Sequence, residues 1–229
     1  MKNFIICLSL WAALPLSAQK IDCGFNFGLL IPQGEFANSL SRSVGAGGRF
    51  KFYYRPSANR PFEIGLEMGF LDFGSERRNF SKMVGNLRHD YKLQANGYLG
   101  ITGLLFRVQA LEQPKLSPFV EGMCGFNFFN NSITLTDEQA FNDDPDQRIV
   151  HSDRTFYYGI NGGVKIRLKS NPKLGLLFSC AYQIGGQAEY GDSPQIDPNL
   201  KVIWNYKKSH TNMLTPQVGI WIIPGCEGI

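Results

Sequence analysis

The first 18 residues of the chain have the composition of an export signal, which restricts what the remainder can fold into. Lys2 and Asn3 precede an apolar run over residues 4–14, and Leu16-Ser17-Ala18 offers small residues at a cleavage point. Directly afterwards, apolar residues occupy every second position, with small or polar residues between them: Ile21, Cys23, Phe25, Phe27 and Leu29. An export signal followed by this alternation predicts a cleaved signal peptide at 1–18 and an outer-membrane β-barrel domain at 19–229.

Charge and cysteine content exclude several classes of protein. The chain has 23 Lys and Arg and 19 Asp and Glu, so without Lys2 the mature charge is 22 − 19 = +3, too small to indicate a nucleic-acid partner. After the signal, no stretch approaches the roughly 18 apolar residues of a transmembrane helix. A helical membrane protein is therefore excluded. The chain has no CxxC pair and no Cys/His cluster, so we expect no zinc site and no cofactor.

The alternation recurs in seven further segments, which gives eight predicted strands. The segments are 44–54, 62–70, 91–102, 120–128, 156–167, 174–184 and 214–222. In the segment 91–102 we place on the outward, apolar face Tyr91, Leu93, Ala95, Leu99 and Ile101. Each segment is near the ~9–11 residues that a tilted strand needs to cross a bilayer. The predicted fold is all-β, an eight-stranded antiparallel up-and-down transmembrane β-barrel.

The predicted connections alternate in length. Short turns rich in Pro, Asn and Ser cover 55–61, 107–116 and 169–173, whereas long polar segments cover 31–43, 73–90, 130–154 and 185–211. This alternation is typical of outer-membrane barrels, which have short periplasmic turns and long extracellular loops. We therefore expect four long extracellular loops and both termini in the periplasm.

The competing fold is a soluble up-and-down barrel with its apolar face inward. In that fold the polar face would meet water and carry many Lys and Glu. Here the polar face is mostly Gly, Asn, Gln, Ser and Tyr, which suits the narrow lumen of an eight-stranded barrel. The membrane barrel is the better interpretation.

Charged residues on the polar face are candidates for a network in the lumen: Arg49, Lys51, Glu63, Glu67, Lys92, Glu121, Lys165 and Arg167. If the hairpin 44–70 pairs symmetrically about its turn, Arg49 faces Glu67 and Lys51 lies near Glu63. Two functions are open for this network. It is either a polar plug or a selectivity lining for small ions, and the plug is favoured because such barrels are filled by side chains.

The histidines and the charged loops give weaker signals. His89, His151 and His210 lie in the long-loop half, but adjacent residues of an extended chain point to opposite sides, so His151-Ser152-Asp153 is not a catalytic triad. The spacing of acidic residues in 130–154 does not match an EF-hand, so no metal site is expected. The second loop is basic, and we hypothesise that it meets lipopolysaccharide phosphates or the acidic loop through Arg77, Arg78, Lys82 and Arg88.

The cysteines suggest one covalent link. Cys23 begins the first predicted strand and Cys226 follows the last, so a disulfide between them could close the barrel. Cys124 and Cys180 lie on strands with another strand between them. We expect these two to remain unpaired and face lipid.

Several local patterns resemble the eight-stranded outer-membrane β-barrel proteins of Bacteroidetes-type bacteria, which are of the OmpX and OmpA-barrel kind. The patterns are Phe27-Gly28 with Pro32-x-Gly34-x-Phe36, Pro118-Phe119-Val120-Glu121, Gly159-x-x-Gly162-Gly163-Val164 and Gly185-Gly186-x-Ala188-x-Tyr190. The family is largely without assigned activities, so the resemblance implies no catalytic residues. The chain departs from it by ending in Pro224-Gly225-Cys226-Glu227-Gly228-Ile229, where many such barrels end on an aromatic residue.

The predicted function is a non-enzymatic outer-membrane barrel that presents surface loops for interaction or envelope integrity. The alternatives are a narrow channel for ions or small solutes and a surface lipid-modifying or proteolytic barrel enzyme. The expected partners are outer-membrane lipid, lipopolysaccharide and the barrel-assembly machinery, with the protein itself a monomer.

Overall fold

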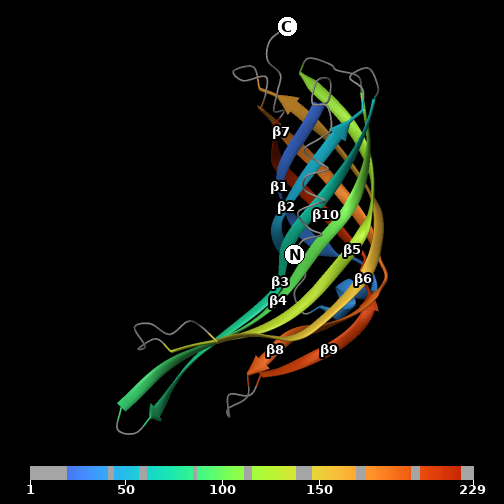
Figure 1. The fold of residues 1–229 in the computed structure, drawn as a ribbon. Helices are drawn as coiled ribbons and strands as arrows, with labels where there is room; N and C mark the ends of the chain where they lie inside the picture. The colour runs from blue at the N-terminus through green and yellow to red at the C-terminus, as the bar shows by residue number, and fades with distance from the viewer. Residues whose placement is uncertain are drawn as a thin grey trace, which may run out of the picture.

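The computed structural model describes residues 20–40, 44–56, 61–84, 87–110, 115–137, 146–168, 174–196 and 202–222. Within these ranges eight strands close into one antiparallel barrel, in the order β1-β10-β7-β6-β5-β4-β3-β2 (Figure 1). They are β1 (Lys20–Pro32), β2 (Gly45–Arg55), β3 (Phe62–Val84), β4 (Leu87–Gln109), β5 (Leu116–Asp137), β6 (Asp146–Arg167), β7 (Leu174–Gly185) and β10 (Met213–Ile222). The predicted fold class is confirmed.

The first and last strands of the barrel close it. β1 pairs with β10 from Cys23 opposite Ile222 to Pro32 opposite Met213, and on its other side β1 pairs with β2. Every barrel strand therefore has a neighbour on both sides, which leaves the wall itself without an open edge. The predicted signal peptide at 1–18 lies outside the described residues. Among the described residues, no helix is long and apolar enough to cross a membrane.

The outer face of the wall is apolar. Large apolar side chains that point outward keep about half of their surface exposed, as in Phe27 (50%), Phe106 (53%) and Ile160 (56%). The residues between them point inward and are buried, as the alternation predicts. The predicted faces agree with the structure in every barrel strand except β4.

In β4 the predicted inward and outward faces were exchanged, because the alternation was assigned one residue out of phase. Leu99 and Ile101 point inward and are buried, whereas Leu104 and Phe106 face outward. The part of β4 that belongs to the barrel wall begins near Tyr98 and continues to Gln109, through residues that were assigned to a short turn. The inward face is apolar here because other apolar residues fill the barrel mouth, as described below.

The polar segments 73–90 and 130–154 were predicted as loops but are mostly strand. β3 and β4 remain paired as far as Val84 opposite Leu87, and β5 and β6 as far as Leu135 opposite Asp146. β4 and β5 also pair beyond the barrel rim, so the two hairpins form one projecting sheet, here called the arm (residues 74–84, 87–97, 131–137 and 146–151). Figure 1 shows the β3–β4 part of the arm extending away from the barrel at the lower left.

The segment 185–211, also predicted as a loop, holds a separate hairpin. β8 (Gln187–Ile196) and β9 (Val202–His210) form a two-stranded sheet that crosses the end of the barrel (Figure 1). A short helix, α2 (Glu35–Ser39), follows β1 and contacts β9. Gly34 precedes this helix with φ of 59°, a conformation that glycine adopts without steric cost. We call β8 and β9 together the cap hairpin.

Candidate functional site

A network of buried charges fills the barrel interior. It lies between the cap hairpin and the opposite end, where the connections between strands are short. Each member projects inward from the wall because it lies in phase with the inward face of its strand. Among the described residues of the barrel strands, the buried cations are Arg49, Lys51, Arg55, Arg107 and Lys165, and the buried anions are Asp22, Glu63, Glu67 and Glu121. We call this set the charged plug.

Glu121 is the centre of the charged plug. Its carboxylate oxygens accept hydrogen bonds from Lys51 Nζ at 2.7 Å and from Arg107 Nη2 at 2.7 Å. Tyr53 Oη donates to the same carboxylate at 2.6 Å, and Asn161 Nδ2 does so at 3.0 Å. Charge-assisted bonds from several strands satisfy this fully buried carboxylate, which would otherwise be costly to remove from water.

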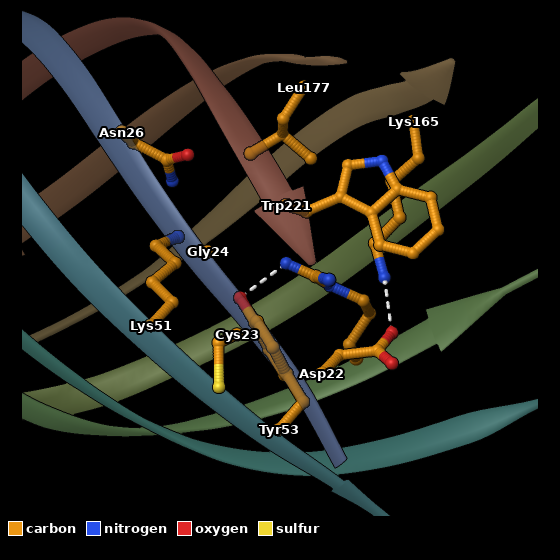
Figure 2. Close-up of a pocket in the computed structure, with 10 residues that line it drawn as sticks. Asp22, Cys23, Gly24, Asn26, Lys51, Tyr53, Lys165, Leu177 and Trp221 are labelled. Carbon is orange, nitrogen blue, oxygen red and sulfur yellow. Dashed lines mark hydrogen bonds and ion pairs between the residues drawn. The ribbon is translucent and has the colours of Figure 1, made fainter. Parts of the chain in front are cut away.

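A second group of charges lies toward the short-turn end. Arg55 hydrogen-bonds Glu63, whose other oxygen lies 3.6 Å from Arg107 Nη1 and 3.7 Å from Lys165 Nζ. Lys165 Nζ also pairs with Asp22 at 3.2 Å, and its charge lies 5.0 Å from the ring centre of Trp221 (Figure 2). Cations therefore alternate with anions along the interior.

A third group lies toward the capped end. Arg49 Nη1 is 3.5 Å from Glu67 Oε2, and Tyr157 Oη donates to the other oxygen of Glu67. Arg49 Nη2 also donates to Gln183 at 3.0 Å and to Thr215 at 3.3 Å. These contacts connect β2, β3, β6, β7 and β10 across the lumen, so the charged plug also ties opposite walls of the barrel together.

The space left inside the charged plug is small. A cavity of about 10 Å³, measured as the volume open to the centre of a water molecule, lies among residues that include Asp22, Lys51, Tyr53, Lys165 and Trp221 (Figure 2). That is about the size of one water molecule. The arrangement can hold the barrel rigid and closed, but it leaves little room for a solute in this part of the lumen.

The structure brings together most of the predicted network residues: Arg49, Lys51, Glu63, Glu67, Glu121 and Lys165. Two others lie elsewhere. Lys92 lies on the arm, on the face continuous with the outer wall, because the faces of β4 were assigned the wrong way round. Arg167 is half-buried at the last residue of β6, at the short-turn end.

The predicted partners within the network also need correction. Lys51 stands opposite Glu67, and its closest carboxylate is that of Glu121, not that of Glu63. Arg49 stands opposite Gly69 and reaches Glu67 only diagonally. The prediction placed Glu67 opposite Arg49, whereas the structure places Gly69 there, so the register is shifted by two residues. The centre of the turn was therefore assumed at the wrong point.

Sequence reasoning missed three members of the charged plug, Asp22, Arg55 and Arg107, and it also missed Tyr53, which donates to Glu121. Arg107 had been assigned to a turn. The alternation of Leu104, Phe106 and Val108 would have placed it on the inward face, because these three residues all point outward. Tyr53 was overlooked because an aromatic residue on the polar face gives no charge signal.

The barrel mouth is closed by a second cluster, which is apolar. Tyr190 of the cap hairpin packs edge-on against Phe36 of α2, with ring centres 5.1 Å apart, and lies 5.4 Å from Phe129 of β5. Phe73 completes the aromatic group, 5.9 Å from Phe129. These residues are buried together with Leu30, Leu71, Leu99, Ala188 and Met213. The apolar inward face of β4 is explained by this cluster.

Polar contacts join the cap hairpin to the barrel rim and to α2. Asn131 of β5 makes two hydrogen bonds with the backbone of Gly191, of 3.0 and 3.2 Å, and Asp153 of β6 accepts the backbone N–H of Glu189 at 2.7 Å. From the other side, Lys207 Nζ donates to the carbonyl of Ser39 at 2.7 Å. Side-chain contacts therefore bind the cap, and its described residues have no β-ladder pairing to the wall.

The histidines are not brought together. His151 lies at the rim against Tyr206, 4.7 Å between ring centres, His89 lies near the tip of the arm beside Tyr91, and His210 ends β9. His151 and Asp153 point to the side opposite Ser152, as expected for a strand. Within the described ranges there is no group of His, Cys, Asp and Glu that could hold a metal ion.

The acidic and basic segments are only partly described. Asp137 and Asp146 end the paired parts of β5 and β6, whereas Glu138, Asp143 and Asp144 lie outside the described residues. Asp153 belongs to the cap contacts. The exposed side chains of Arg77 and Arg78 lie on the arm.

The described cysteines lie at outward-facing positions of their strands. Cys124 and Cys180 are exposed free thiols on β5 and β7. Cys23 is a free thiol in the structure, and Cys226 lies outside the described residues. The closure disulfide between these two therefore remains a prediction without structural support.

Comparisons with known proteins give likenesses of fold. No protein-family model matches the chain, and neither does any curated protein sequence. Neisserial surface protein A is similar at 12% identity and a TM-score of 0.41, over 89% of this chain and 96% of that one. A major outer membrane protein from Thermus thermophilus is 13% identical with a TM-score of 0.42, over 89% and 98%. Ail, the attachment invasion locus protein of Yersinia pestis, is 14% identical with a TM-score of 0.34, over 90% and 97%.

Proposed function

We propose that the protein is a closed, non-enzymatic outer-membrane barrel that holds a projecting sheet at the cell surface for interaction. The observation that carries this proposal is the division of the wall into two faces. The outer face presents apolar side chains, and the inner face holds buried charges that are paired with one another. This is the distribution expected of a wall in lipid, since a water-exposed apolar belt around a monomer would promote association.

The filled interior favours a plug over a channel. A conducting lumen needs continuous space for hydrated ions, whereas here charged side chains cross from wall to wall and the apolar cluster closes the mouth. Eight-stranded barrels are wide enough only for their own side chains. The channel alternative therefore has no observation in its favour.

The arm is the surface that the barrel presents. Beyond Asp72, β3 pairs only with β4 among the described residues, so one side of the projecting sheet is an edge. Strand edges carry backbone donors and acceptors that a partner strand can use, and apolar side chains nearby would add contact area. Met83 and Ile149, both on the arm, are 61% and 67% exposed. We propose protein or envelope partners that bind along this edge.

Lipid is the second class of partner that we propose. Arg77, Arg78 and Arg88 expose guanidinium groups on the arm, and guanidinium binds phosphate through two parallel hydrogen bonds. Lipopolysaccharide carries such phosphates. If this is correct, replacing the three arginines by glutamine weakens association with lipopolysaccharide, and unchanged association together with unchanged order of the arm would discard it. Recognition by the barrel-assembly machinery and a Bacteroidetes-type origin remain parts of the proposal.

Cysteine labelling on intact cells tests the location and the orientation. In a variant without its natural cysteines, Met83→Cys places a thiol on the arm and Lys115→Cys places one at the exposed short-turn end. We expect a maleimide that cannot cross the outer membrane to label M83C on whole cells, and K115C only after the envelope is permeabilised. Equal labelling of the two before permeabilisation would contradict the proposal.

Planar-bilayer recording separates the plug from the channel. The refolded mature protein should insert without producing stable unitary current steps, because the charged plug and the apolar cluster fill the lumen. Reproducible conductance steps from folded protein would overturn the closed barrel and restore the channel alternative.

A further inference from the structure

The cap hairpin is attached to the barrel in a different way from every other strand. Each barrel strand shares backbone ladder bonds with two neighbours, but β8 and β9 pair only with each other among the described residues. Its polar links to the rest of the molecule are those of single side chains, chiefly Asn131, Asp153, Glu35 and Lys207. A unit held in this way can separate from its support without breaking the ladder of the wall.

The two connections of the cap hairpin to the barrel lie side by side. β7 ends at Gly185, and the chain returns through Thr211 to β10. The N–H and the hydroxyl of Thr211 both bond the carbonyl of Gly186, at 3.3 and 3.1 Å. The packing is so close that a Cβ on Gly185 would lie 2.0 Å from the hydroxyl oxygen of Thr211. The chain therefore enters and leaves the cap hairpin at adjacent positions, which is the arrangement that a hinge requires.

Rotation about that line would uncover one defined surface. The underside of the hairpin contributes Ala188 and Tyr190, and the wall contributes Leu71, Leu99 and Phe129, all with 0% exposure. The charged plug lies further down the barrel and does not depend on the hairpin for its ion pairs, which join barrel strands to one another. The wall therefore has its own support when the mouth is open.

We propose that the cap hairpin is a hinged lid, which opens as a unit at Gly185-Gly186 and Thr211 while the barrel wall stays folded. Opening exposes the apolar cluster that closes the mouth on the arm side of the barrel. The lid is a property of the fold itself, so it holds or fails independently of the membrane location and of any partner of the arm.

Matched cysteine variants in lipid vesicles test the lid. In a cysteine-free background, Ala188→Cys reports the underside of the hairpin, and Ala181→Cys makes the same chemical change in β7, opposite Asn161 at the level of the charged plug. Both alanines have 0% exposure. A thiol at either site can react with a soluble reagent only when its surroundings open. The comparison therefore distinguishes opening of the lid from unfolding of the wall.

We expect A188C to react at least tenfold faster than A181C, at a rate that depends little on denaturant, whereas labelling of A181C should rise steeply with denaturant. Adding Asn131→Ala to A188C removes two hydrogen bonds to the lid and should raise its rate by roughly another tenfold. Labelling of A181C should not change with N131A. Equal rates and equal denaturant dependence at the two sites would overturn the lid.

Hydrogen exchange on the unsubstituted protein provides the same test without new side chains. The amides of Glu189 and Gly191 donate to Asp153 and Asn131 of the wall, so opening of the lid frees both of them, and they should exchange at least tenfold faster than amides of the barrel part of β4. Protection of these two amides equal to that of the wall would show that the cap is a fixed part of the core, and the proposal would fail.

Discussion

The arm and the cap hairpin leave the same rim of the barrel and then run in different directions. In the arm, β3, β4, β5 and β6 stay paired beyond the rim, with register shifts at Asp72/Gly74 and at Asn131/Ser132. The cap hairpin breaks from the ladder after Gly185 and folds back across the mouth. The arm extends through continued backbone pairing, whereas the fold-back of the cap hairpin depends on apolar burial and single side chains.

The local sequence explains this difference. The arm is largely polar, and apart from a few buried residues such as Leu93 and Ala95 its strands run on into solvent. The cap begins with Gly185-Gly186 and then places Ala188 and Tyr190 on one face. Such a face has to be covered, and the aromatic group at the mouth covers it. Long connections between barrel strands thus form the projecting arm in one case and the cap hairpin that covers the mouth in the other.

The largest effect is expected in the wall beneath both hairpins. Glu121→Gln keeps the size of the side chain but leaves Lys51 and Arg107 without their shared negative charge in a buried site. Breaking a buried pair in this way costs about 3–5 kcal/mol. Unfolding of the mature protein in vesicles, followed by fluorescence of Trp221 in a Trp204→Phe background, should show that loss.

A charge change on the arm is the matched control for that measurement. Glu76→Gln alters a half-exposed residue beyond the rim and should leave the unfolding midpoint of the wall nearly unchanged. If E121Q cost less than about 1 kcal/mol, the charged plug would not support the wall, and the contrast between wall and hairpins would lose its basis.

The same contrast explains how far the sequence could predict the structure. Alternation located the barrel and placed Arg49, Glu67 and Glu121 on the inward face, because one side of each of these strands carries apolar side chains and the other carries polar or small ones. In β4 the rule failed. Leu99 and Ile101 are apolar and inward, since they pack in the apolar cluster that the cap hairpin covers, which alternation alone cannot reveal.

The hairpins themselves could not be predicted for a related reason. Strands of the arm that meet water on both faces carry no period-two signal, so a polar segment such as 73–90 is indistinguishable from a loop. The contacts of the cap are also unpredictable, because the pairing of Asn131 with Gly191 joins residues 60 positions apart. Arg107 was missed because the predicted strand ended before it. Its charge alone would have made it a candidate.

A proline in the arm should have an intermediate, local effect. Gln94 lies in the middle of the arm, opposite Arg77 on one side and Thr134 on the other. Gln94→Pro removes a ladder donor and distorts a central strand, so amides of the arm should lose at least tenfold in hydrogen-exchange protection. Gln94→Thr, which suits a strand, is the control. Loss of protection in β8 and β9 as well would contradict the independence of arm and cap.

The smallest effect is expected from alkaline pH on the cap. Burial raises the pKa of Tyr190 above its ordinary value, although its hydrogen bond with Ser209 opposes the rise. Because the folded state prefers the neutral phenol, its contribution to closure is complete below a pH of about 10 and is lost as the pH rises through the folded-state pKa. Tyr190→Phe removes the titration and one hydrogen bond, a loss of about 1 kcal/mol.

The labelling rate of A188C, divided by its rate in the Y190F background, should therefore increase between pH 9 and pH 11, as expected if ionised Tyr190 favours the open lid. The ratio cancels the pH dependence of the thiol reaction itself, so a constant ratio would mean that the phenol does not help to hold the mouth closed.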